Sequence, residues 1–295
     1  MPDSDRTTEL ARRLQEGCLI GDGAMGTTLS AHGHEAGGAA ELLNVEQPDL
    51  VRAAHRAFLE AGSDVIQTNT FQGSRPALAN HGLGDRTVEI NAAAAALARE
   101  AAGDAAFVAG SIGPTGKLLE PYGDFPPAAA RAAFEEQAQA LADGGVEFFI
   151  VETMSAIEEA LLAVTAAAAT GLPVVASMAF VPIGRTDFGV SPEQAATQLS
   201  AAGAIVVGAN CGVVSSAEMV DIIRLFREVT DLPLIAQPNA GRPRRTQSGV
   251  VFPETPELMA EAAPHFRDLG VTLIGGCCGS TADHIRAIAA RLREA

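Results

Sequence analysis

Three of the four cysteines are arranged in a way that suits metal chemistry. Cys277 and Cys278 are adjacent in the glycine-flanked sequence GGCCG, and Cys211 lies far upstream, after Asn210. Adjacent cysteines rarely form a disulfide with each other because the geometry is strained. Three thiolates suit a soft, tetrahedral divalent ion, for which zinc is the usual choice, and they leave its fourth position open. The alternative is that these are small apolar core residues, which explains a lone cysteine better than this set of three.

Two other residues bear on the metal hypothesis. His284 is the nearest imidazole in the sequence, but it falls in the first turn of the last predicted helix, where we expect it to be solvated. Cys18 begins the first predicted strand, and we interpret it as a core thiol at the bottom of the fold. The sequence therefore offers no obvious fourth protein ligand.

The cysteines must be positioned by elements that alternate along the whole chain. Short runs that start almost continuously apolar are typical of parallel strands buried on both faces, and alanine-rich amphipathic stretches lie between them. The eight predicted strands are residues 18–24, 64–70, 107–113, 148–153, 173–180, 204–211, 233–240 and 271–278. The predicted helices are residues 48–61, 86–102, 128–143, 155–170, 192–202, 215–229, 255–269 and 281–293. This pattern predicts an α/β fold, a single (β/α)8 TIM barrel over residues 1–295, in preference to a doubly wound open sheet.

The predicted strands end in polar residues. In a (β/α)8 barrel the carboxyl ends of the strands carry the active site, so these side chains are expected to meet at one mouth and bind a small polar ligand. The strand-end residues are Asp22, Asn69, Thr70, Ser111, Glu152, Asn210 and Asn239. Asp22 and Glu152 form a plausible pair for an ammonium group. The alternative for either acid is that it caps the following helix.

The first strand runs into GDGAMG (residues 21–26), which matches the dinucleotide-binding pattern G-x-G-x-x-G. Such a site needs a helix that opens at once, and the following TTLSAHGHEAGG is too glycine-rich for a sustained helix. Asp22 also places an acid in the turn. A nucleotide-dependent oxidoreductase is therefore the weaker hypothesis, and we expect the glycines to let backbone N–H groups approach a carboxylate closely.

Two loops are longer than simple connections, residues 27–47 after the first strand and 242–252 after the seventh. Both fall on the predicted active face, and the second is expected to close over the site. Its arginines, Arg242, Arg244 and Arg245, are interpreted as a solvated run. His55 and His81 are interpreted as packing or surface residues.

Composition excludes several classes of protein. Twenty Lys and Arg against 36 Asp and Glu give a net charge of −16, which disfavours nucleic acid and anionic lipid as partners. No apolar stretch reaches the roughly 18 to 20 residues of a membrane span. The polar N-terminus does not resemble a secretory signal, so a reduced, cytoplasmic location is expected.

The sequences DGAMGT (22–27), NC (210–211), QPNAG (237–241) and GGCCG (275–279) resemble, in this order, the homocysteine S-methyltransferase family. The likeness runs from about residue 10 to 293. Further runs, ELLNVEQPDLV, SDVIQTNTF, SIGPTG and PNAGRP, are similar to the homocysteine-binding module of cobalamin-dependent methionine synthase.

The resemblance implies a (β/α)8 barrel that methylates the thiol of L-homocysteine to give L-methionine. It implies zinc ligands at Cys211, Cys277 and Cys278, and acids at Asp22 and Glu152 that hold the substrate amino group. The other implied substrate contacts are Gly23, Ala24, Asn69, Ser111 and Asn210. The homocysteine thiol, with a pKa near 8.5, is mostly protonated at neutral pH, and ligation to zinc would give the nucleophilic thiolate.

The methyl donor is the part that the resemblance leaves open. Likeness to methionine synthase favours a methylcorrinoid, but the sequence contains no D-x-H-x-x-G cobalamin motif, so methylcobalamin would come from a separate corrinoid-binding protein. The alternative is a sulfonium donor such as S-methylmethionine. Betaine ranks third, because Tyr122 and Phe71 alone make a thin aromatic cage. A barrel that binds homocysteine and zinc but is inactive without its partner is a further alternative.

Overall fold

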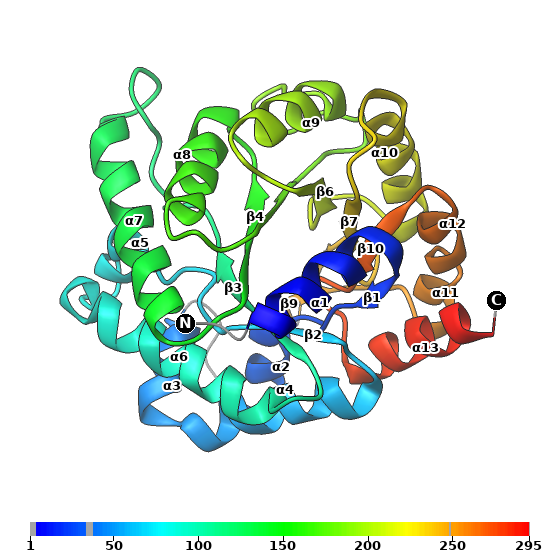
Figure 1. Ribbon diagram of the computed structural model, residues 1–295, viewed down its shortest axis with the longest axis horizontal. Coiled ribbons are helices and arrows are strands. Elements are labelled where there is room, and N and C mark those ends of the chain that lie inside the picture. Colours follow the sequence, from blue (N-terminus) through cyan, green and yellow to red (C-terminus); the bar gives the residue numbers. More distant parts are fainter. Residues whose placement is uncertain (1–3, 34–37, 248, 295) are drawn as a thin grey trace.

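The structure, a computed structural model, describes residues 4–33, 38–247 and 249–294. Eight parallel strands form one sheet in the order β1-β10-β7-β6-β5-β4-β3-β2, which curls into a barrel (Figure 1). The strands are β1 (Leu19–Ile20), β2 (Val65–Gln67), β3 (Phe107–Ile112), β4 (Phe148–Met154), β5 (Val174–Met178), β6 (Val206–Asn210), β7 (Leu234–Gln237) and β10 (Val271–Ile274). The predicted (β/α)8 barrel is therefore confirmed, with each observed strand lying inside or within one residue of its predicted run.

The seam between β1 and β2 is closed by two aspartates. The backbone N–H of Asp64 donates to the Ile20 carbonyl at 2.7 Å, and the Ile20 N–H donates to the Asp64 carboxylate at 2.9 Å. At the other end of the seam, the N–H of Gln67 donates to Oδ2 of Asp22 at 2.8 Å. Carboxylates thus accept hydrogen bonds where a regular ladder would use backbone carbonyls.

Helices form an outer ring around the strands (Figure 1). They are α4 (Pro48–Ala61), α6 (Thr87–Ala102), α7 (Pro127–Asp143), α8 (Ile157–Ala168), α9 (Pro192–Ala201), α10 (Ser216–Val229), α11 (Pro256–Ala260), α12 (Ala263–Asp268) and α13 (Ala282–Arg293). The prediction of one continuous helix over residues 255–269 was wrong, because the structure has two short helices there, α11 and α12. The prediction for α4 was right at both ends, because Pro48 begins the helix and Gly62 ends it with a φ of 106°.

Short elements fill the long loops. After β1 come α2 (Met25–Ala31), the 3-10 turn η1 (Ala40–Leu42) and α3 (Leu43–Glu46), and α5 (Arg75–Ala79) and η2 (Gly84–Arg86) follow β2. Residues 34–37 of the predicted 27–47 loop lie outside the described part of the chain. The expectation was that no sustained helix follows GDGAMG; the structure has a short helix there, α2, which begins at Met25 and has seven residues.

A helix that the sequence did not reveal, α1 (Ser4–Glu16), lies across the bottom of the barrel (Figure 1). Leu10 and Leu14 are fully buried in a cluster with inward-facing strand residues such as Leu19, Phe148 and Ile235. Burial of two leucines contributes about 1.5–3 kcal/mol each to holding this helix in place.

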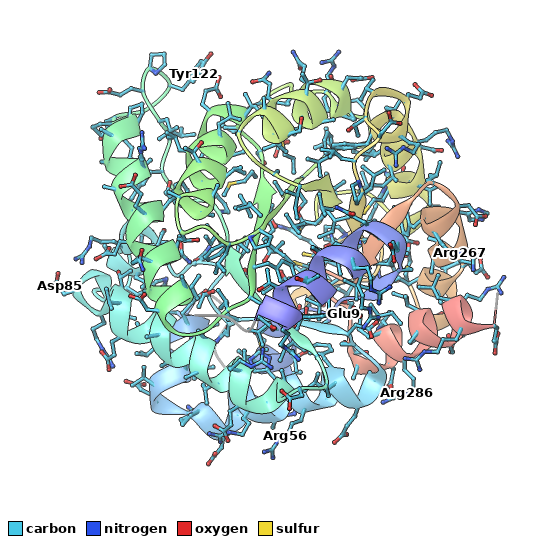
Figure 2. The ribbon with its side chains drawn as sticks, viewed as in Figure 1. Glu9, Arg56, Asp85, Tyr122, Arg267 and Arg286 are labelled. Carbon is cyan, nitrogen blue, oxygen red and sulfur yellow. The ribbon has the colours of Figure 1, made fainter. Side chains whose placement is uncertain are left out.

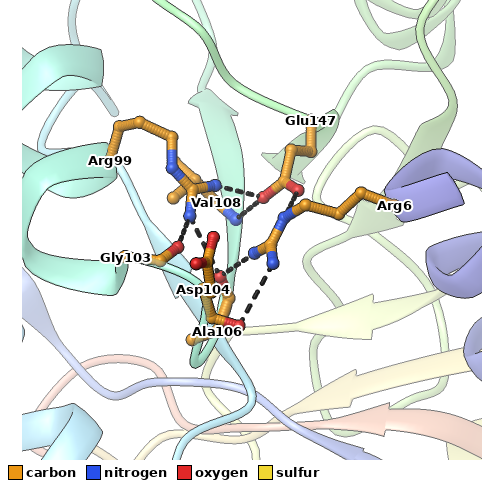
Figure 3. Close-up of polar contacts among 7 residues, drawn as sticks. All are labelled: Arg6, Arg99, Gly103, Asp104, Ala106, Val108 and Glu147. Atoms are coloured by element: carbon orange, nitrogen blue, oxygen red, sulfur yellow. Dashed lines mark hydrogen bonds and ion pairs between the residues drawn. The ribbon is translucent and has the colours of Figure 1, made fainter. Parts of the chain in front are cut away.

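Charged groups also fasten α1. Arg6 is ion-paired with Glu147, which precedes β4, and Arg99 of α6 reaches the same carboxylate at 2.6 Å (Figure 3). The Val108 N–H donates to Glu147 at 2.8 Å, and Arg6 also donates to the carbonyls of Asp104 and Ala106. Both carboxylate oxygens of Glu147 are therefore paired at this end of the barrel.

The loop after β7 forms a hairpin of β8 (Arg244–Thr246) and β9 (Gly249–Val251) at the mouth. A Cβ built on Gly279 would lie 2.3 Å from the Phe252 ring, so Phe252 packs directly on the turn that follows Cys278. Phe252 therefore lies beside the cysteine cluster, whereas closure of residues 242–252 over the site stays a prediction. Among the helices of the described residues, none is both long and apolar enough to cross a membrane.

Candidate metal centre and substrate site

The three cysteines predicted to bind metal meet at the mouth of the barrel. Cys211 directly follows β6, and Cys277 and Cys278 follow β10. All three sulfur atoms lie within 4.8 Å of one another, and the Sγ atoms of Cys211 and Cys278 are 3.9 Å apart. A tetrahedral ion with Zn–S distances of 2.3 Å requires sulfurs about 3.8 Å apart. The donor set and its spacing therefore fit one zinc ion with three protein ligands.

The backbone is held in place around these thiols. Cys211 has a φ of 55°, a left-handed conformation that costs a non-glycine residue about 1–3 kcal/mol. Its N–H donates to the Gln237 carbonyl at 3.0 Å, and the N–H of Cys277 donates to the Pro238 carbonyl at 2.8 Å. β7 thus fixes the strand ends on both of its sides and brings the two cysteine-bearing segments together.

Hydrogen bonds among the three thiols shift the pKa values of Cys277 and Cys278 in opposite directions. Contacts from Cys211 and Cys277 lower the pKa of Cys278, whereas contacts with Cys211 and Cys278, together with burial, raise the pKa of Cys277 well above its usual range. Cys18 lies apart, half-buried against the main core, and burial raises its pKa to about 11. The interpretation of Cys18 as a core thiol is confirmed.

Asp22 is 1% exposed and faces the mouth just beyond β1. Gln67 holds both of its oxygens, through the backbone N–H at 2.8 Å and through Nε2 at 3.2 Å. Burial raises the pKa of Asp22 to about 7, and the hydrogen bonds from Gln67 oppose that rise only in part. Gln67 was not among the predicted site residues, although it is the last residue of β2.

Glu152, near the end of β4, is 8% exposed. Ser111 Oγ donates to its Oε1 at 2.5 Å, and Asn210 Nδ2 lies 3.4 Å from its Oε2. Burial raises its pKa to about 7; the Ser111 hydrogen bond lowers the pKa, and the charge of Asp22 raises it. In the described part of the chain, no arginine, lysine or histidine forms a salt bridge with Asp22 or Glu152. These two carboxyls thus form a buried acidic pair that lacks a cation.

Asn210 connects Glu152 to the cysteines. Its Oδ1 accepts from the Thr153 N–H and from Ser177 Oγ, both at 2.7 Å. Its Nδ2 donates to Thr153 Oγ1 at 2.7 Å and lies 3.8 Å from Cys277 Sγ. Because both ends of the amide have partners, Asn210 is placed to orient its neighbours, and its contact with substrate stays a prediction. Thr153, with a φ of 59°, and Ser177 are site residues that the sequence reasoning missed.

Three of the predicted substrate contacts have other partners. Asn69 Nδ2 donates to the Ala40 carbonyl at 2.8 Å and to Asn44 Oδ1 at 3.1 Å, so it anchors the η1–α3 segment. The Ala24 N–H donates to Ser280, to the carbonyl at 3.3 Å and to Oγ at 3.2 Å. Gly23 packs closely, since a Cβ there would lie 2.7 Å from the Phe58 ring. The structure thus groups Asp22, Ser111, Glu152 and Asn210 more closely than Asn69 and Ala24.

Two expectations about exposed residues were wrong. His284 is buried, and its ring contacts Thr281 through Nδ1 at 3.0 Å and the Glu254 carbonyl through Nε2 at 3.1 Å, so it neither is solvated nor completes the metal cluster. Arg242 is not simply solvated but forms an ion pair with Glu218 and lowers the pKa of that carboxyl to about 2. Arg244 and Arg245 are exposed, as expected.

Fold and site together define a (β/α)8-barrel protein with a cluster of three cysteines, spaced as the ligands of one metal ion, beside a buried acidic pair. A profile of the homocysteine S-methyltransferase family matches residues 19–292. The chain belongs to this family.

Individual relatives show how much of each protein is shared. Methionine synthase of Mycobacterium tuberculosis is 33% identical over 96% of this chain, which spans only 25% of that protein. Betaine–homocysteine S-methyltransferase 1 of Mus musculus is 34% identical over 96% of the chain and 74% of that protein. The metallated homocysteine methyltransferase MmuM from Escherichia coli has the same fold, with a TM-score of 0.78 at 23% identity, covering 94% of this chain and 97% of that one.

Proposed function

We propose that this chain transfers a methyl group to the thiol of L-homocysteine, giving L-methionine, with zinc held by Cys211, Cys277 and Cys278. The observation that carries the proposal is the cluster of three sulfurs within 4.8 Å of one another, next to two buried carboxyls that lack a cation. Membership of the family and the name of the betaine–homocysteine relative support the same acceptor.

The chemistry divides between the metal and the side chains. Zinc held by three thiolates would bind the substrate sulfur at its remaining position and lower the pKa of that thiol. Asp22 and Glu152 would bind the substrate ammonium group, which supplies the missing positive charge and restores their pKa to lower values. Ser111 and Asn210 orient Glu152, and Asn210 couples this carboxyl to the segment that bears Cys277.

The source of the methyl group falls into two classes. Likeness to methionine synthase favours a methylcorrinoid carried by a separate protein; the chain spans 25% of the mycobacterial enzyme. A small sulfonium donor such as S-methylmethionine is the alternative. The alternative is supported by betaine–homocysteine S-methyltransferase, a relative that is named for a small methylated cation. The match covers 74% of that protein.

The test is methionine formation from homocysteine by the zinc-loaded protein with S-methylmethionine, betaine and methylcobalamin in parallel reactions. Turnover with methylcobalamin alone would support a corrinoid partner, and turnover with a small donor would support a self-sufficient enzyme. Failure with all three donors, with zinc bound and corrinoid protein added, would contradict the proposed function.

A further inference from the structure

Two neighbouring strands of the barrel, β1 and β2, are not joined by a regular ladder. They stand at the opposite ends of the strand order, whereas β5 and β6, for example, are paired in register from Val175 to Met178 of β5. In the described residues, side chains take part in most of the hydrogen bonds that cross the seam between β1 and β2. The wall of the barrel therefore depends on side chains at this seam.

The bottom end of the seam is closed by Asp64, and a cation of the protein lies beside its carboxylate. Oδ2 of Asp64 accepts from the Ile20 N–H at 2.9 Å, and Oδ1 accepts from Arg13 at 3.1 Å. Arg13 belongs to α1, the helix that carries Glu9 in Figure 2. The charge of Asp64 is thus balanced by the protein, and this end of the seam is complete without a ligand.

The mouth end of the seam is closed by Asp22, which has no such partner. Gln67 of β2 donates to Oδ2 of Asp22 through its backbone N–H at 2.8 Å and to Oδ1 through Nε2 at 3.2 Å. The next hydrogen bond along the seam in the described residues, from Ser63 Oγ to the Gly21 carbonyl at 3.3 Å, lies toward the bottom, before β2 begins. The mouth end therefore depends on one carboxyl group.

The backbone of Asp22 is fixed on its other side, to the segment that follows β10. The N–H of Gly21 donates to the Ile274 carbonyl at 2.8 Å, and the N–H of Gly276 donates to the Asp22 carbonyl at 2.9 Å. The two backbones are in close contact, since a Cβ on Gly275 would lie 2.9 Å from the Asp22 carbonyl oxygen. The backbone of Asp22 is thus held against β10, and only its side chain reaches β2.

The strength of the junction between Asp22 and Gln67 depends on the charge of the carboxyl group. Hydrogen bonds to an ionised acceptor are roughly twice as strong as those to a neutral one. Asp22 is 1% exposed, and burial raises its pKa to about 7, so the charged and the neutral forms are both populated near neutral pH. A bound ammonium group would hold Asp22 in its charged form, and a carboxylate that accepts two hydrogen bonds from Gln67 still has lone pairs for it.

We propose that Asp22 couples ligand binding to closure of the barrel wall. An ammonium group bound at Asp22 strengthens its junction with Gln67, and β1 and β2 separate more easily at the mouth when no ammonium group is bound. The junction itself follows from the geometry. Its control by the substrate rests on the proposed function, which places the ammonium group of homocysteine at Asp22.

Amide hydrogen exchange of the zinc-loaded full chain, followed by NMR at single residues, measures the junction directly. Asp22→Ala removes the acceptor, so the Gln67 N–H should exchange about tenfold to a hundredfold faster. Asp22→Asn should have a smaller effect, about threefold to tenfold, since its amide oxygen still accepts. In addition, Oε1 of Gln67, which has no partner in the described residues, can accept from the new amide nitrogen.

The neighbouring amide is an internal control. The Thr68 N–H donates to the Ala109 carbonyl of β3 at 2.9 Å, away from the seam, and should keep its exchange rate in both Asp22 variants. Asp64→Asn is the matched control at the bottom, where it should speed exchange of the Ile20 N–H and leave that of Gln67 unchanged. Equal acceleration at Gln67 and Thr68, or no acceleration at Gln67, would overturn the junction.

Control by the ligand is tested with saturating L-homocysteine and with saturating 4-mercaptobutyrate, which keeps the thiol and the carboxylate but lacks the ammonium group. Homocysteine should slow exchange of the Gln67 N–H in the unaltered chain about threefold to tenfold, and 4-mercaptobutyrate should not. Slowing by both compounds, or by neither while calorimetry shows that homocysteine binds, would overturn control by the ammonium group. A chain that binds no homocysteine would overturn the proposed function, and the Asp22 variants would still test the junction.

Discussion

Strand β4 carries a buried carboxylate at each end, and the two have opposite surroundings. Glu147, just before the strand, and Glu152, near its end, are both 8% exposed. Glu147 is bound by Arg6, Arg99 and the Val108 N–H. Glu152 receives hydrogen bonds from neutral groups, Ser111 and Asn210, and faces Asp22, a second acid.

Glu147 and Glu152 are equally buried, but only Glu147 is paired with cations of the protein. We interpret this difference as a stabilising role for Glu147 and a ligand-binding role for Glu152. A buried charge without a partner costs free energy unless it becomes neutral. At the bottom of the barrel the protein supplies the cations itself, which fastens α1 to the strands. At the mouth no salt bridge in the described chain neutralises Asp22 or Glu152, so the protein itself leaves these two acids to be balanced by protons or by a cationic ligand. The comparison supports an ammonium-bearing substrate at the mouth.

The largest effect is expected from the cysteines at the mouth. Cys211→Ala, Cys277→Ala or Cys278→Ala should each lose bound zinc and methionine formation, because two thiolates do not complete the site. Metal content after dialysis and turnover are the two measurements. Cys18→Ala, at the bottom, should keep both, and full activity in any variant of the cluster would refute the metal assignment.

At the bottom, removal of the paired carboxylate should cost stability and leave the chemistry unchanged. Glu147→Ala is expected to lower the free energy of unfolding by about 2–3 kcal/mol, since it removes an acceptor of three hydrogen bonds, two of them from partly exposed arginines. Urea denaturation measures this loss. The exposed Glu228→Ala is the control, and a loss no larger than that of the control would show that α1 is held by its leucines alone.

The mouth should respond in the opposite way. Glu152→Gln keeps an acceptor for Ser111 but removes the charge, so we expect homocysteine to bind about tenfold more weakly. Zinc should be retained, because Glu152 is not a ligand. An unchanged apparent affinity, measured by calorimetry on the zinc-loaded protein, would exclude this residue from the substrate site.

Much of this fold could be predicted because its signals are local. Buried parallel strands are nearly continuous apolar runs, and the polar residues that end them, such as Glu152 and Cys211, stand out in the sequence. The clustering of the three cysteines followed from the same alternation, since strands that share a barrel bring their carboxyl ends to one mouth.

The features that could not be predicted from the sequence depend on contacts between distant segments. The sequence of helix α1 is mostly polar, so it does not look like a packed element. Its contact with the barrel rests on two buried leucines, Leu10 and Leu14. Asn69 ends its strand as expected, but its amide binds Ala40 and Asn44, which no spacing in the sequence relates to it. The roles of Thr153 and Ser177 depend on where the Asn210 amide points, and the sequence does not determine that orientation.

The last expected effect concerns the dependence of stability on pH through the unpaired acids. Burial holds the pKa values of Asp22 and Glu152 at about 7, above the value near 4 of the unfolded chain. The folded state therefore binds more protons than the unfolded state between pH 4 and 7, and stability falls as pH rises through that range. We expect the metal-free chain to lose roughly 2–3 kcal/mol per group between pH 5 and pH 8.

Comparison with Asp22→Asn and Glu152→Gln isolates this contribution. The buried His55, whose pKa burial lowers to about 4, acts in the opposite direction, because it loses stability as pH falls below its unfolded value of 6.5. His55 is present in all three chains, so its effect cancels in the difference between their unfolding curves. Identical pH profiles would mean that the acids at the mouth are already neutralised, which would remove the reason to expect an ammonium ligand there. A profile that flattens in the variants would show that Asp22 and Glu152 titrate in the folded chain with no cation of the protein beside them, as the proposed ammonium site requires.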